Sequence, residues 1–406
     1  MKRRLLCWLL LLSLFAPVLP DALPFAAAEE VTLSVGDSSA DVATMKKRLY
    51  ELGYYSKNSF TKKFTEDTAE VVRWFQRVNG LEETGELSPA DAAVLYSDSA
   101  LRAPLQTPAP YATPAPTPEV DYPSTDDAGF LPEDSDEEFV YENDDGGLWV
   151  YISRDLKVVI TRREDSSVPL IWFETEIWVR GEQRLRTVET NPDRPGTKFR
   201  YPYDIATDNN MVLAFSDDFY GDRVYNKKTV GTIIREGVII RDKTSSKQSR
   251  SLPNLDVMAQ YADGSLKVYT ATEYTAQELL DMGAINVWCF GPIIIRDGEM
   301  SELMLSGYYK SREPRQALGM IEPNHYLLVS VQGRMTESAG CDLWHVAGIM
   351  LEHGVTEALN LDGGNTMALV FRGRMINKLA TWKKKKFVRA VNSLIGVGYT
   401  ENMAEE

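Results

Sequence analysis

A long segment of unusual composition divides this chain into two parts that must fold separately. Residues 99–147 begin with a stretch rich in Pro, Thr and Ala and continue with twelve acidic and no basic residues between Glu119 and Asp145. The Pro-rich part favours extended polyproline II, and the acidic part repels itself. We therefore predict a disordered linker between a small domain, residues 30–98, and a large domain, residues 148–402.

The composition restricts what the two domains can do. The formal net charge is −15, and the acidic segment accounts for most of it. A nucleic-acid-binding protein would need a basic footprint, so that class is unfavoured. Cys7, Cys289 and Cys341 are too few for a disulfide scaffold. A disulfide between Cys289 and Cys341 and two separate buried thiols both stay open.

The N-terminus has the pattern of a secretory signal peptide. Lys2, Arg3 and Arg4 precede the apolar run Leu5–Ala16, and three alanines end at Ala28. We predict cleavage after Ala28, so that residues 1–28 are the signal peptide and the mature chain, which has no second long apolar run, has no transmembrane span. An uncleaved anchor helix is the alternative, although the run is short for a bilayer.

Three short helices are predicted in the small domain. Apolar residues recur at helical spacing from Val42 to Leu52, and Gly53 follows as a stop signal. A second helix opens at Thr65, and a third at Ser88, where Ser is the N-cap and Pro89 the first helical residue.

The small domain also resembles a known family. Its pattern is similar to the peptidoglycan-binding domain type 1, and the positions that carry the resemblance are Gly36-Asp37, Val42, Leu49, Leu52-Gly53-Tyr54-Tyr55, Phe64, Thr68, Val72, Phe75-Gln76, Asn79-Gly80-Leu81 and Thr84-Gly85. The resemblance implies a non-catalytic role in which residues 30–98 bind cell-wall peptidoglycan. A three-helix module without binding is the alternative.

Strand-like runs dominate the large domain. They are Leu148–Ile152, Lys157–Thr161, Ile171–Val179, Val212–Phe215, Val238–Arg241, Lys267–Thr272, Tyr326–Val331 and Ala368–Phe371. Helical spacing occurs at Ala276–Met282 and Asp342–His353. Many strands with few helices predict an α+β fold, so the whole chain is expected to be a small three-helix domain followed by a large strand-rich domain.

The segment Ala358–Thr366 is the most informative about chemistry. Asn360 and Asp362 alternate with leucines, so both polar side chains point to the same side of a strand. Gly363 and Gly364 then allow a ligand to approach the backbone amides, and Thr366 adds a hydroxyl. This set suits a ligand with phosphate or sugar oxygens; a tight strand-to-turn corner is the alternative.

Together with four other segments, this one resembles the phosphodiester glycosidase family across residues 148–400. Asp218-Phe-Tyr-Gly221, Phe290-Gly-Pro292, Arg315-Gln-Ala-Leu-Gly319, Asn360-Leu-Asp-Gly-Gly364 and the segment that begins at Arg389 occur in the family's order. Two positions depart from the pattern. Ser216-Asp217 replaces Asn-Gly, and Asn365-Thr366 follows the double glycine where the family continues with Gly and Ser.

The resemblance implies hydrolysis of a sugar-1-phosphodiester at the anomeric carbon. We assign Arg315 to a phosphate clamp, Asp362 as the first choice for base or nucleophile, and Asp218 as the second choice. The implied substrate-binding residues are Asn360, Gly363, Gly364, Thr366, Tyr220, Gly291 and Arg389. No cofactor is required; a divalent cation between Asp218 and Asp362 is compatible with this set, and the metal stays undetermined.

Two rival functions are weighed against this one. Ser338-Ala-Gly-Cys341 with His325 upstream imitates an L,D-transpeptidase, but the arginine expected after that cysteine is missing. The other rival is a non-catalytic protein that binds wall glycans. A zinc amidase is unfavoured because His345 and His353 lack an HExxH pattern. The favoured prediction is a secreted, cell-wall-associated hydrolase.

Overall fold

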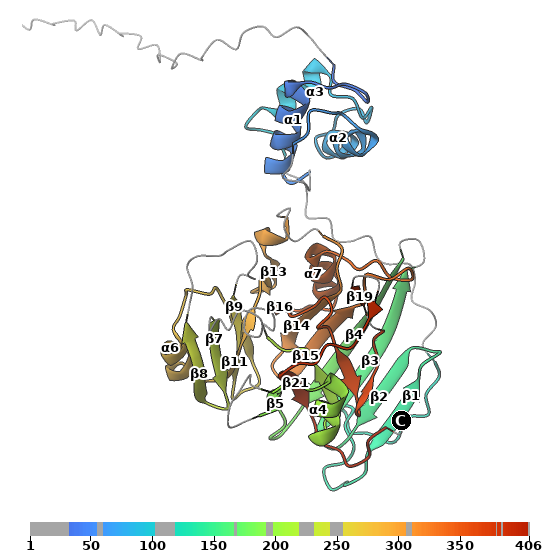
Figure 1. Cartoon of the computed structure of the whole chain (residues 1–406), viewed down its shortest axis with the longest axis vertical. Helices are drawn as coiled ribbons and strands as arrows, with labels where there is room; N and C mark the ends of the chain where they lie inside the picture. Colours follow the sequence, from blue (N-terminus) through green and yellow to red (C-terminus); the bar gives the residue numbers. More distant parts are fainter. Residues whose placement is uncertain are drawn as a thin grey trace, which may run out of the picture. The chain divides into compact units, whose positions relative to one another are not determined.

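The structure is a computed structural model of the chain. It describes residues 32–54, 60–101, 118–165, 169–191, 198–218, 231–243, 255–305, 311–378, 380–382 and 385–404. The predicted signal peptide and Tyr220 lie outside these residues. The chain divides into two compact units near Ala103 (Figure 1). Within the described residues, no helix is both long enough and apolar enough to cross a bilayer.

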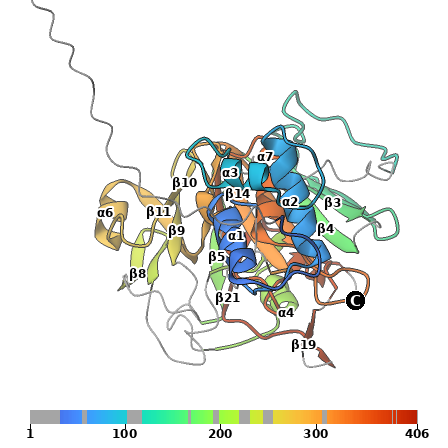
Figure 2. The same ribbon diagram turned by 90° about the horizontal axis from the view of Figure 1, so that it is seen from above.

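The small unit is a three-helix domain, as predicted (Figure 2). Its helices are α1 (Ala40–Glu51), α2 (Glu66–Val78) and α3 (Pro89–Leu95). The Ser88 side chain accepts the Asp91 N–H, and the Asp91 carboxylate accepts the Ser88 N–H, so a capping box starts α3. The apolar faces meet in one core, which includes Val42, Met45, Leu49, Phe64, Val72 and Phe75.

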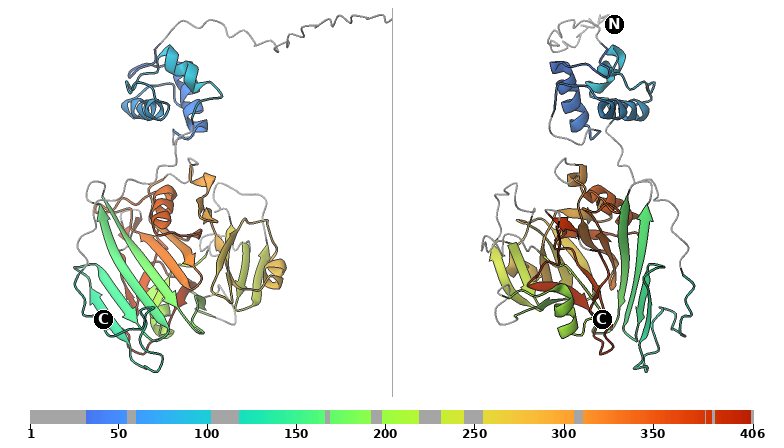
Figure 3. Two further views of the ribbon diagram at one scale, coloured as in Figure 1. Left: turned by 180° about the vertical axis from the view of Figure 1, so that it is seen from behind. Right: turned by 45° about the vertical axis from the view of Figure 1, so that its right-hand side comes forward.

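The large unit is built on a nine-stranded antiparallel sheet in the order β1-β2-β3-β4-β15-β14-β16-β12-β13. These strands are β1 (Phe139–Asn143), β2 (Leu148–Ile152), β3 (Leu156–Asp165), β4 (Leu170–Val179), β12 (Ile293–Arg296), β13 (Glu299–Met300), β14 (Arg315–Glu322), β15 (His325–Val331) and β16 (Glu357–Leu361). The long strands β3 and β4 are seen from behind in Figure 3.

Smaller sheets complete the unit. One has the order β10-β9-β11-β7-β8 and another β18-β17-β6-β21-β5, with β19-β20 as a separate pair. The strands are β5 (Arg186–Glu189), β6 (Leu213–Phe215), β7 (Gly231–Arg235), β8 (Val238–Lys243), β9 (Asp256–Tyr261), β10 (Leu266–Tyr269), β11 (Ala284–Phe290), β17 (Leu369–Phe371), β18 (Arg374–Met375), β19 (Thr381–Trp382), β20 (Lys385–Lys386) and β21 (Ser393–Val397).

Helices cover the sheets on their outer sides and leave a shared core between them. The helical segments are α4 (Pro202–Asp208), α6 (Ala276–Asp281), α7 (Leu343–Glu352) and the short 3-10 turn η1 (Glu302–Leu305). Helix α7 packs on the nine-stranded sheet through residues such as Val346 and Met350. The central core joins Phe173 and Leu328 of that sheet to Phe215 and Trp288 of the smaller sheets. The predicted α+β class is confirmed.

Part of the acidic segment is folded, so the predicted disordered linker is too long. Phe139–Asn143 was expected to be disordered but forms β1, paired with β2 from Phe139↔Ile152 to Asn143↔Leu148. Arginines of the large domain compensate negative charges of the acidic segment. Glu142 accepts hydrogen bonds from Arg372 and Arg374. Self-repulsion therefore does not keep this part of the segment unfolded, and the folded domain begins before residue 148.

The two cysteines of the large domain are separate buried thiols. Cys289 and Cys341 are both buried, and neither belongs to a disulfide within the described residues. The Cys289 thiol lies 3.3 Å from the Leu255 carbonyl oxygen. Of the two alternatives that the sequence left open, the structure has the one without a disulfide.

Candidate active site

Adjacent strands of the large sheet bring distant segments of the sequence together. Strand β14 pairs with β15 through Arg315↔Val331 and with β16 through Gln316↔Leu361. The residues just before β14, just after β15 and just after β16 therefore meet at one end of these neighbouring strands. Two of the segments that the sequence analysis singled out, at Arg315 and at Asn360, are brought together there.

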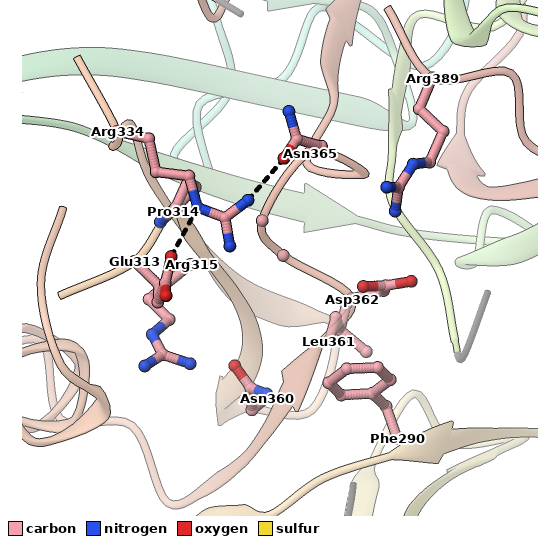
Figure 4. A pocket seen from close by; sticks show the side chains of 12 residues that line it. Phe290, Glu313, Pro314, Arg315, Arg334, Asn360, Leu361, Asp362, Asn365 and Arg389 are labelled. Carbon is pink, nitrogen blue, oxygen red and sulfur yellow. Dashed lines mark hydrogen bonds and ion pairs between the residues drawn. The ribbon is translucent and has the colours of Figure 1, made fainter. Parts of the chain in front are cut away.

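A pocket of about 350 Å³ opens where these strand ends meet (Figure 4). Its lining residues are Phe290, Glu313, Pro314, Arg315, Arg334, Asn360, Leu361, Asp362, Gly363, Gly364, Asn365 and Arg389. Three arginines and two carboxylates thus share one small cavity with a phenyl ring. Arg315, Asn360, Asp362, Gly363, Gly364 and Arg389 are the predicted site residues that the structure places there.

The double glycine turns tightly against the segment before β14. A Cβ atom on Gly363 would lie 2.6 Å from the Pro314 carbonyl oxygen, so no larger residue fits. Gly364 has a φ of +57° and donates its N–H to that same oxygen at 2.9 Å. The predicted use of the Gly364 amide as a phosphate donor is therefore corrected, because that hydrogen-bond donor is already occupied.

Arg315 is a partly buried cation whose contacts are all neutral. Its Nε donates to the Cys341 carbonyl at 3.2 Å, and one terminal nitrogen donates to the Ser311 carbonyl at 2.8 Å. Within the described residues it forms no ion pair with a carboxylate. Burial lowers the pKa of its guanidinium from the ordinary value, yet an arginine stays charged at neutral pH. A partly buried positive charge of this kind is suited to an anionic ligand.

Arg334 and Arg389 place two further guanidinium groups at the pocket. Arg334 Nε donates to Glu313 Oε2 at 2.6 Å, and one of its terminal nitrogens donates to Asn365 Oδ1. Arg389 donates to Thr366 Oγ1 at 2.8 Å. Thr366 is buried and does not line the cavity, so its hydroxyl positions Arg389 and was wrongly assigned to direct ligand contact.

Asn360 presents an unusual acceptor. Its side chain is 5% exposed, and its Nδ2 donates to the Gly291 carbonyl at 2.9 Å. Its Oδ1 is buried and has no hydrogen-bond partner in the described part of the chain. Gly291, a predicted binding residue, is not among the residues that line the pocket, and its carbonyl fixes the amide of Asn360. A buried acceptor that borders a cavity is positioned to receive a hydroxyl or N–H group of a ligand.

Asp218 is not brought into the pocket. Its carboxylate is fully buried in an ion pair with Arg235 of β7 at 2.9 Å. This internal partner explains why the second-choice catalytic carboxylate is unavailable to a ligand. Its neighbour Asp217 instead supports the site, since the Asp217 carbonyl accepts the Asp362 N–H at 3.2 Å. In the part of the chain that the structure describes, no three His, Cys, Asp or Glu side chains are grouped as metal ligands.

The arrangement around Cys341 argues against the transpeptidase. Burial raises the pKa of the Cys341 thiol, which makes the reactive thiolate scarce. Glu313, at one end of β14, forms a bridge with Cys341, whereas His325 pairs with Glu322 at the other end. The histidine and the thiol thus lie roughly 30 Å apart along the strand at the rise of a β-strand.

Six lining residues were not among the predicted site residues: Phe290, Glu313, Pro314, Arg334, Leu361 and Asn365. Phe290 and Leu361 lie in segments that carried the family resemblance, and Asn365 was noted as a departure without being given a role. Glu313 had no sequence signal, because only the pairing of β14 with β15 brings it to Arg334.

Comparison of the sequence with known families gives a match that contains the pocket. Residues 209–398 match the family model described as phosphodiester glycosidase. All twelve pocket-lining residues fall inside this matched range. Residues 38–95 match the peptidoglycan binding domain family, which covers the three helices of the small domain.

An individual relative of the chain is distant. An uncharacterized SPbeta prophage-derived protein, YomE, of Bacillus subtilis is 25% identical over 179 residues, which are 44% of this chain and 27% of that protein. The chain thus spans about a quarter of that relative's length.

Matches to solved structures have low sequence identity. One match is the catalytic domain of zebrafish N-acetylglucosamine-1-phosphodiester α-N-acetylglucosaminidase, auto-inhibited by its pro-peptide. The TM-score is 0.47 and the sequence identity 17%, and the match covers 61% of this chain and 83% of the zebrafish chain. A hypothetical protein from Synechocystis has a TM-score of 0.41 and 14% identity over 65% and 64%.

Proposed function

We propose that this protein is a secreted, cell-wall-associated hydrolase that cleaves the bond between a sugar's anomeric carbon and a phosphodiester. The observation that carries the proposal is the pocket that Arg315 and Asp362 share. It holds a partly buried cation, which pairs with no carboxylate among the described residues, and an acidic side chain in one cavity, within the range matched by the phosphodiester glycosidase family.

The chemistry of the leaving group explains why one carboxylate is enough. An ordinary glycosidase needs a second carboxylic acid to protonate the departing alkoxide. A phosphate is already a weak base, so it leaves as an anion that a guanidinium can stabilise. Arg315 supplies this positive charge in our assignment, and Arg334 and Arg389 add to it.

Asp362 is assigned to the anomeric carbon as base or nucleophile. As a base it takes a proton from water while the water oxygen bonds to the anomeric carbon. The bond from that carbon to the phosphate oxygen breaks, and its electron pair leaves with the phosphate monoester. The acceptor Oδ1 of Asn360 binds a sugar hydroxyl or N–H group at the same time. The products are the free sugar and a phosphate monoester.

The small domain suggests where the substrate lies. A peptidoglycan-binding domain would hold the enzyme at the cell wall, and anionic wall glycopolymers offer sugar phosphodiesters there. The two units together support a wall polymer as the substrate class, after secretion directed by residues 1–28.

The test compares three variants on UDP-N-acetylglucosamine, UDP-glucose and the methyl diesters of both sugar 1-phosphates. Asp362→Asn and Arg315→Ala should each lower kcat/KM by roughly 10²- to 10⁴-fold. Asp281→Asn, on α6 outside the pocket, is the matched control and should behave as wild type. Wild-type activity that survives both pocket substitutions would overturn the assignment. Binding of wall glycans without any turnover would favour the non-catalytic alternative.

A further inference from the structure

A chain of three polar side chains forms one wall of the pocket. Glu313 precedes β14, Arg334 follows β15 and Asn365 follows β16, yet Arg334 bonds to both of the others. Figure 4 shows this chain on the side of the pocket opposite Phe290. We call these three residues the polar wall.

Asn365 is held at both ends of its amide. Its Oδ1 accepts from Arg334, and its Nδ2 donates to the Ala380 carbonyl at 3.2 Å. The amide therefore has one orientation, and the side chain cannot swing aside without the loss of two hydrogen bonds. The position of Asn365 limits the room on this side of the cavity.

Arg334 is fixed by its backbone as well as by its partners. Its φ of +60° lies in the left-handed region, which is uncommon for a residue with a side chain. The turn directs the guanidinium over the double glycine, where one terminal nitrogen would lie 3.6 Å from a Cβ atom on Gly364. The polar wall is thus a preformed surface rather than a set of mobile side chains.

The two sides of the pocket offer different chemistry. Phe290 and Asp362 lie on one side, and the polar wall on the other (Figure 4). A cavity of about 350 Å³ is near the lower end of the usual size of ligand pockets, about 300–1,000 Å³. A sugar phosphate uses most of that space, so the group beyond the phosphate must be small or must extend outside.

We propose that the polar wall is the subsite for the group beyond the phosphate, and that Asn365 restricts this group to a small polyol such as glycerol. This inference rests on the proposed function, since it assigns the phosphate to Arg315. Beyond the bonds among themselves, carboxylate, guanidinium and amide groups can form further hydrogen bonds with hydroxyls, whereas an aromatic group would desolvate them without adding a hydrogen bond. Asn365 acts in this assignment as a residue that determines specificity.

The test measures binding separately from turnover. Isothermal titration calorimetry compares glycerol 3-phosphate with benzyl phosphate on the full chain. Wild type should prefer glycerol phosphate by about tenfold or more, and Asn365→Gly should reduce this preference to roughly threefold or less. An equal ratio in both proteins, or a wild-type preference for benzyl phosphate, would overturn the inference.

A second variant and a control guard against a simple loss of structure. Asn365→Ser keeps a short polar side chain and should give an intermediate ratio, and thermal unfolding shows whether each variant is folded. Asn209→Ser changes an asparagine at the end of α4, outside the pocket, and should keep the wild-type ratio.

Hydrolysis of the glycerol and benzyl esters of N-acetylglucosamine 1-phosphate and glucose 1-phosphate reports the proposed function on its own. If neither ester is cleaved, the proposed function fails, while the binding ratio still decides the role of Asn365.

Discussion

The backbone N–H of Asp362 donates to the carbonyl oxygen of Asp217, 3.2 Å away. This bond ties the loop after β16 to the end of β6, so two sheets support the carboxylate assigned to catalysis. The side chain of Asp217 is 7% exposed and accepts a hydrogen bond from Ser393. Burial, and then the neighbouring Asp218, raise the pKa of Asp217 well above its ordinary value.

Asp217→Asn should change how stability depends on pH. The pKa of an aspartate in the unfolded chain is about 3.9, whereas folded Asp217 keeps its proton to higher pH. The native state then binds more protons than the unfolded state, so the free energy of unfolding falls as pH rises from about 4 through the raised pKa. Asparagine resembles the protonated acid and removes this fall.

Urea unfolding between pH 4 and pH 8 checks the prediction. The stability of Asp217→Asn should increase relative to wild type as the pH rises. Asp134→Asn, in the exposed acidic segment, serves as the control and should not change the pH dependence. Parallel curves for wild type and Asp217→Asn would show that Asp217 is ionised in the native protein.

Arg315→Lys separates charge from geometry. Lysine keeps the positive charge but lacks the planar fork, which donates here to Cys341 and Ser311 as well as toward the pocket. We expect kcat/KM to fall by about 10- to 100-fold, which corresponds to the loss of one or two hydrogen bonds to a charged group. The fall should be larger for Arg315→Ala. Full activity of the lysine variant would mean that a point charge suffices at this position.

The sequence predicted several of the strands and the ligand loop because both depend on local pattern. Apolar runs mark β2 and β15, and Asn360, Asp362 and the double glycine are neighbours in the chain. Residues that reach the site through strand pairing were not predictable in this way. Glu313 meets Arg334 only because β14 pairs with β15, and the burial of Asp218 depends on Arg235 in another sheet.

Arg372→Ala should loosen the acidic segment and destabilise the large domain. Arg372 is 8% exposed, pairs with Glu142 of β1 at 2.7 Å and donates to the Asn402 carbonyl at 2.6 Å. Loss of this buried partner should lower the free energy of unfolding by about 3 kcal/mol. Arg374→Ala removes a more exposed ion pair with the same glutamate and should cost less, about 0.5–1 kcal/mol.

Limited proteolysis should show where Arg372→Ala acts. Cleavage between residues 118 and 145 should become faster than in wild type, and Arg374→Ala should have a smaller effect. Equal cleavage rates in all three proteins would mean that the arginines do not hold β1 against the sheet.

Removal of residues 32–101 should abolish retention on the cell wall while leaving the chemistry intact. The small domain has its own apolar core, and the lining residues of the pocket all belong to the large unit. Co-sedimentation with purified peptidoglycan should therefore fall by about tenfold or more, because the truncated chain lacks the domain that matches the peptidoglycan-binding family. Turnover of a soluble methyl diester should stay within about twofold of the full chain.

The isolated small domain, added in excess, should compete with the full chain for peptidoglycan. A truncated chain that still sediments would assign wall binding to the large domain instead.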